Sequence, residues 1–111
     1  PLLGRDAMNI EVKILRNEHG KPAGKLADAE IHFIAGELAG LKLVGFTIWE
    51  RRDGNGRRVT FPGRPLIVHG DKRNFELLRA IGNPNVLDHV RDLVLRAYEQ
   101  QAQDTMRAVS Q

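Results

Sequence analysis

Apolar and polar residues alternate along much of the first half of the chain, a period typical of half-buried β-strands. Four stretches follow this pattern, at residues 8–16, 24–34, 41–50 and 57–61. The last two are separated by Arg52-Asp53-Gly54-Asn55-Gly56, and Asp-Gly and Asn-Gly pairs supply the positive φ angles that tight hairpin turns need. We therefore expect four strands in a mainly antiparallel sheet.

The third of these stretches is apolar on both faces. Phe46 and Ile48 share one face, and Leu43 and Trp49 lie on the other. A strand of this kind needs cover on both sides. We expect a helix to supply it on one side and another sheet or a second subunit on the other.

A second hairpin is predicted after the first. Pro62-Gly63-Arg64-Pro65 ends the preceding strand, because neither proline can donate a hydrogen bond to a ladder. The short apolar run Leu66–Val68 then reaches a turn at residues 69–72, and residues 74–78 return from it. The alternation also assigns two aromatic residues to the core, Phe61 and Phe75.

Apolar residues recur at helical spacing near the end of the chain, over residues 86–100. Either Asn83 or Asn85 can cap the start of this helix. The polar residues 101–111 either extend the helix or fray. Strands followed by one C-terminal helix predict an α+β fold, with a mainly antiparallel sheet of about five strands.

Length and composition agree with one small core, which we place in a single domain at residues 8–100, with residues 1–7 as an extension. The chain has 111 residues, 41% of them hydrophobic and 28% charged, and no cysteine. Disulfides, a thiol nucleophile and a cysteine-based zinc site are thereby excluded. No apolar run approaches the roughly 20 residues of a membrane span, and no signal-peptide pattern is present, so we expect a cytoplasmic protein. A second subunit would bury surface that so short a chain leaves exposed.

Positive charge is concentrated in the middle third of the chain. Residues 50–81 contain eight basic and four acidic residues, a net charge of +4, whereas the rest of the chain carries −1. Seven of the basic residues lie at or near the two hairpins: Arg51, Arg52, Arg57, Arg58, Arg64, Lys72 and Arg73. Such a cluster suits phosphate groups, because binding releases condensed counterions. A solvated face that keeps edge strands from pairing with other chains explains it as well.

Other chemistry is weakly indicated. Trp49 precedes the arginines and can stack on an unpaired base, although core packing explains it equally well. The histidines His19, His32, His69 and His89 are scattered without metal-ligand spacing. Asp28, Glu30 and His32 share a strand face, which fits an acid/base set or an ordinary polar sheet face. We find no phosphate loop or nucleophile motif, and we expect no catalytic residues, metal, cofactor or small-molecule substrate.

The order of these segments resembles the SpoVG family of bacterial regulators, named for stage V sporulation protein G. The resemblance covers residues 9–99 and is carried by Ile10–Ile14, Leu26–Ile31, Val59–Arg64, Asp71–Phe75 and Val90–Glu99. It implies a small homodimeric regulator without enzymatic activity. It also implies nucleic-acid binding through basic residues around Pro62-Gly63-Arg64 and the neighbouring loop.

These observations lead to one hypothesis and one alternative. The hypothesis is a non-enzymatic, homodimeric protein that binds DNA or RNA and contacts phosphates through an arginine-rich hairpin surface. The alternative is a dimeric protein-interaction module whose basic face binds an acidic protein partner. Competition between nucleic acid and such a partner would distinguish the two.

Overall fold

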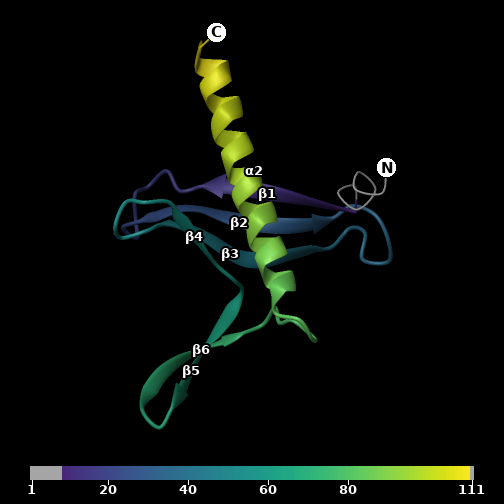
Figure 1. The fold of residues 1–111 in the computed structure, drawn as a ribbon, viewed down its shortest axis with the longest axis vertical. Helices are drawn as coiled ribbons and strands as arrows, with labels where there is room; N and C mark the ends of the chain where they lie inside the picture. The colour runs from purple at the N-terminus through teal and green to yellow at the C-terminus, as the bar shows by residue number, and fades with distance from the viewer. Residues whose placement is uncertain (1–8, 111) are drawn as a thin grey trace.

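The computed structural model describes residues 9–110, so the predicted extension at residues 1–7 and the start of the first predicted strand at Met8 lie outside the described residues. Within residues 9–110 six strands are followed by one helix, in the arrangement drawn in Figure 1. The elements are β1 (Ile10–Arg16), β2 (Lys25–Phe33), β3 (Lys42–Glu50), β4 (Arg57–Thr60), β5 (Gly63–Val68), β6 (Asp71–Glu76) and α2 (Asn85–Ser110).

The strands form two separate antiparallel sheets. Four of them make one sheet in the order β1-β2-β3-β4, and β5 pairs only with β6. Each strand of the larger sheet lies beside its neighbour in sequence, as expected when short turns join alternating segments. The predicted α+β class is confirmed, with six strands where the sequence indicated about five.

A β-bulge in β3 changes which residues of that strand face the helix. Ala29 pairs with Phe46 and Ile31 pairs with Leu43, so two residues of β3 oppose one of β2. One of these two is Gly45, whose φ of 113° is a conformation that side chains rarely adopt. The extra residue puts Leu43 on the core side together with Phe46, whereas simple alternation placed them on opposite faces.

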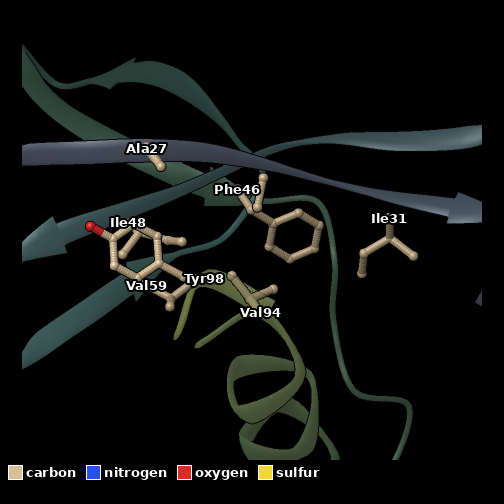
Figure 2. Close-up of a cluster of buried hydrophobic side chains, with 8 residues drawn as sticks. Ala27, Ile31, Phe46, Ile48, Val59, Val94 and Tyr98 are labelled. Carbon is tan, nitrogen blue, oxygen red and sulfur yellow. The ribbon is translucent and has the colours of Figure 1, made fainter. Parts of the chain in front are cut away.

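The core lies between α2 and one face of the four-stranded sheet. Figure 2 shows Val94 and Tyr98 of the helix directed at the side chains of β3 and β4. Phe46 and Ile48 are fully buried, and Phe61 meets Phe46 edge-on with 5.5 Å between ring centroids. Burial of these side chains fixes the helix on this face. On the opposite face of the sheet, no second layer is formed by residues 9–110.

One of the two asparagines that could cap the start of helix α2 does so in the structure. The Asn83 side-chain oxygen accepts a hydrogen bond from the backbone N–H of Asn85 at 2.9 Å, which selects Asn83. Pro84 lies between this cap and Asn85, the first residue of α2, where its missing N–H costs nothing. The helix then continues to Ser110, so the polar segment after residue 100 extends it.

The β5–β6 hairpin projects away from the sheet and the helix (Figure 1), and we call it the arm. Among its strand residues only Leu66 is even partly buried. The preceding strand β4 ends at Thr60, before Pro62, as predicted. The next strand begins at Gly63 and not at Leu66, because Pro65 lies at an outer edge where no donor is needed. The predicted core position of Phe75 is wrong. Phe75 is 45% exposed, because the arm has no layer packed against it.

Candidate nucleic-acid interface

The sheet face opposite α2 carries a tryptophan between two cations. In the strand register Trp49 pairs with Lys25 of β2 on one side and with Arg58 of β4 on the other. The guanidinium carbon of Arg58 lies 5.3 Å from the centre of the indole ring, within the range of a cation–π contact. Lys25 was absent from the predicted set because its place beside Trp49 depends on a bulge between Lys25 and Ala27.

Hydrogen bonds hold the Trp49 ring in position. Its Nε1–H donates to Thr60 Oγ1 at 3.0 Å, and the Thr60 hydroxyl donates in turn to the Thr47 carbonyl at 3.5 Å. Beside them, the Thr47 hydroxyl donates to Asp28 Oδ1 at 3.2 Å. Trp49 is half-buried although no second layer from the described part of the chain covers this face. The ring therefore forms a fixed platform with Arg58 against it.

Three exposed arginines surround an open hollow at the β3–β4 turn. The hollow has a volume of about 550 Å³ and is lined by Arg51, Arg52, Asp53 and Arg58. The Asp53 carboxylate accepts a hydrogen bond from the Asn55 backbone N–H at 2.9 Å, which shapes the turn. Within the described part of the chain, none of the three arginines forms an ion pair with a carboxylate. We call these arginines and Trp49 the hairpin site.

Arg57 lies on the other face of β4, away from the hairpin site. Its Nη1 donates to Glu99 Oε1 on α2, and its guanidinium carbon lies 4.8 Å from the centre of the Tyr98 ring. Arg16 approaches the same ring at 5.3 Å. Neighbouring residues of a strand point to opposite faces, so Arg57 joins helix to sheet while Arg58 stays with Trp49.

The remaining predicted cations, Arg64, Lys72 and Arg73, all lie on the arm and are exposed. Arg64 and Arg73 share one face of the hairpin with Leu66, and Lys72 lies on the other beside Ile67. The structure thus divides the seven residues into three groups: the hairpin site, the helix contact of Arg57, and the arm.

The far end of the open sheet face is a network of opposite charges. Glu30 accepts a hydrogen bond from His32 at 2.9 Å and pairs with Lys42 at 3.3 Å. The His32 hydrogen bond, helped by Lys42, lowers the pKa of Glu30 below its ordinary value. Lys13 lowers the pKa of Glu11 in the same way. The predicted acid/base group of Asp28, Glu30 and His32 is thus divided, because Asp28 bonds to Lys25 and Thr47 instead.

Residues 9–110 hold neither a cluster of metal-ligating side chains nor a membrane-spanning helix. No three histidine or carboxylate side chains of this region gather closely enough to hold a metal ion. Its one long helix lacks the apolar stretch that crossing a membrane requires. Comparison of the chain with models of protein families, with curated proteins and with solved structures finds no match.

Proposed function

We propose that this protein is a non-enzymatic, homodimeric regulator of the cytoplasm that binds DNA or RNA through the hairpin site. In this proposal Arg51, Arg52 and Arg58 hold phosphate oxygens, and Arg64 on the arm adds a further contact. Arginine suits this task because its planar guanidinium can donate two parallel hydrogen bonds to a phosphate. The proposal agrees with the expectation from the SpoVG resemblance but does not depend on it.

One observation carries the proposal: three exposed arginines, without carboxylate partners among residues 9–110, line one hollow beside a fixed tryptophan. Surface arginines usually find carboxylates or lie apart, since clustered like charges repel one another. A polyanion relieves that repulsion and releases its own counterions on binding. Among common cellular polyanions, nucleic acids also offer flat bases that an aromatic ring or a guanidinium plane can stack against.

Trp49 gives the site a means of contacting bases. Arg58 covers part of the indole ring. An unpaired base can therefore stack against the guanidinium plane of Arg58. It can also stack against the indole ring itself once Arg58 turns toward a phosphate. Base stacking of this kind accepts any sequence, because every base has a π-face. We therefore expect modest sequence preference.

The experiment uses Trp49 as its own reporter, since it is the one tryptophan of the chain. The intact protein is titrated with single-stranded DNA, duplex DNA and RNA of equal length, and both tryptophan emission and the anisotropy of a labelled strand are recorded. We expect saturable binding that changes the emission and weakens with salt.

A matched pair of variants shows whether the hairpin site is responsible. The triple variant Arg51→Ala, Arg52→Ala, Arg58→Ala should lose most of its binding. The control Lys13→Ala, Lys42→Ala, Arg96→Ala removes three exposed cations elsewhere and should retain it. Equal losses in both variants would mean that net charge alone drives binding, and no binding to any probe at low salt would end the proposal.

A further inference from the structure

The arm has a structure that two strands rarely sustain alone. An isolated two-stranded hairpin is marginally stable in water, yet here both strands are almost fully exposed. Ile67 is 74% exposed, Phe75 45% and Val68 38%. Exposed apolar side chains gathered on one projecting element mark a surface that another molecule covers.

The backbone hydrogen bonds of the arm define which groups face outward. The Leu77 N–H donates to the Pro62 carbonyl at 2.9 Å. Because bonding alternates along an antiparallel pair, the N–H and C=O groups of Arg64 and Leu66 also face β6. Those of Pro65 face the outer edge of β5, where the proline ring leaves no donor. Strand addition on β5 is therefore blocked at its centre.

The outer edge of β6 has no such block. By the same alternation, Lys72, Asn74 and Glu76 direct their N–H and C=O groups outward. Within the part of the chain that the structure describes, no backbone or side-chain group bonds to them. An open edge of this kind is a template for a further strand.

We propose that β6 pairs antiparallel with β6 of a second copy, about a two-fold axis at Asn74, to give one sheet in the order β5-β6-β6-β5. Asn74 then lies opposite Asn74 of the partner subunit. Lys72 lies opposite Glu76 of the partner subunit, and Arg73 lies opposite Phe75 of the partner subunit. Two ion pairs and two cation–π contacts follow from the two-fold symmetry.

Charge selects this register over its neighbours. A two-fold axis at Lys72, Arg73 or Glu76 would place like charges directly opposite one another, which destabilises a strand pair. An axis at Phe75 would move Lys72 and Glu76 of opposite subunits out of register, so the two side chains could not form an ion pair. In the described part of the chain neither Lys72 nor Glu76 forms an ion pair of its own.

The same register joins the apolar residues of both arms. Leu66, Val68 and Phe75 lie on one face of the hairpin, and a two-fold axis perpendicular to the sheet brings the two sets onto a common face. The turn of the partner subunit arrives beside residues 78–80. A hollow of about 300 Å³ lies there, bounded by β6, by that segment and by Leu87 of α2.

Cysteine cross-linking tests the axis directly, because the chain has no native cysteine. Asn74→Cys should form a disulfide dimer under mild oxidation, since paired residues of this type lie about 5.5 Å apart between Cα atoms and disulfides span roughly 4.4–6.8 Å. The control Asp71→Cys leaves the proposed ion pairs intact and should stay monomeric on a non-reducing gel, because the two copies of residue 71 are about 20 Å apart along the strands.

Charge reversal supplies a second, independent measurement. Lys72→Glu and Glu76→Lys should each weaken the dimer about tenfold or more in sedimentation velocity, because two attractions become repulsions. The double variant should restore it. These positions are exposed, and circular dichroism of each variant verifies its fold.

The inference rests on the homodimer in the proposed function, not on nucleic-acid binding, so the failures are distinguishable. A wild-type monomer at every concentration would overturn the homodimer and this interface together. A dimer that is not weakened by either charge reversal, and that cross-links no better through residue 74 than through residue 71, would overturn the β6 interface alone. Loss of nucleic-acid binding would overturn neither.

Discussion

Adjacent arginines of β4 should have different roles, and Arg57→Ala tests this most sharply. Arg57 contacts the Tyr98 ring and pairs with Glu99. A cation–π contact is worth about 0.5–1 kcal/mol at an exposed site. The pair with Glu99 adds about 0.2–1 kcal/mol, because side-chain exposures of 38% and 50% leave it screened by solvent.

The expected loss is therefore about 1–2 kcal/mol, a notable share of the roughly 5–15 kcal/mol that stabilises a domain. For a chain of this size it corresponds to a fall of about 4–10 °C in Tm. Urea unfolding followed by circular dichroism measures the stability, and anisotropy measures nucleic-acid binding. The matched control is Arg52→Ala, which removes an exposed arginine of the hairpin site.

The two variants should show opposite effects. Arg57→Ala should lose stability and keep binding near the wild-type level at a temperature where it is folded. Arg52→Ala should stay within about 0.5 kcal/mol of wild-type stability and bind more weakly, with a salt slope reduced by about 0.7 on single strands. If Arg57→Ala lost more binding than Arg52→Ala at unchanged stability, the division of arginines between the two faces would be wrong.

Three further outcomes follow from the fold. Val94→Ala should lose about 2 kcal/mol in urea unfolding, because two fully buried methyl groups leave a cavity; a change below about 0.5 kcal/mol would argue against the helix position. Gly45→Ala should lose about 1–3 kcal/mol, because its φ is 113° and the new Cβ would lie 3.1 Å from Pro62; wild-type stability would argue against the bulge. Glu30→Gln should reduce the loss of stability on acidification, because the His32 hydrogen bond lowers the pKa of Glu30. The stability that the ionised Glu30 carboxylate contributes is complete above the ordinary pKa of 4.5 and disappears as pH falls through the lowered pKa. Identical acid profiles for both proteins would contradict that hydrogen bond.

Local pattern was sufficient for the fold class but not for the position of the arm. Alternation and the Asp-Gly and Asn-Gly turns indicated β1 to β4, since these signals depend on nearest neighbours. Phe75 was assigned to the core because period-two alternation identifies a face without showing whether anything covers it. Pro62 lies between β4 and β5, as a strand breaker should, whereas Pro65 lies within β5, where an edge position tolerates it.

The site was only partly predictable for a similar reason. Arg51, Arg52 and Arg58 come together because they flank one turn, which the sequence shows directly. The separation of Arg57 from Arg58 also follows from strand alternation, but its contact with Glu99 required the position of α2. Lys25 was missed because a bulge and the pairing of β2 with β3 bring it beside Trp49, and single-sequence patterns do not specify bulges.

Salt dependence of binding is the most direct test of the hairpin site. Affinity for a labelled single strand is measured over a series of salt concentrations, for the wild type and for the Arg51, Arg52 and Arg58 triple alanine variant. The logarithm of affinity should fall linearly with the logarithm of salt, and the variant's slope should be smaller by about 2, or roughly 0.7 for each lost phosphate contact. Equal slopes for the two proteins, or wild-type binding that does not respond to salt, would contradict phosphate binding at this site.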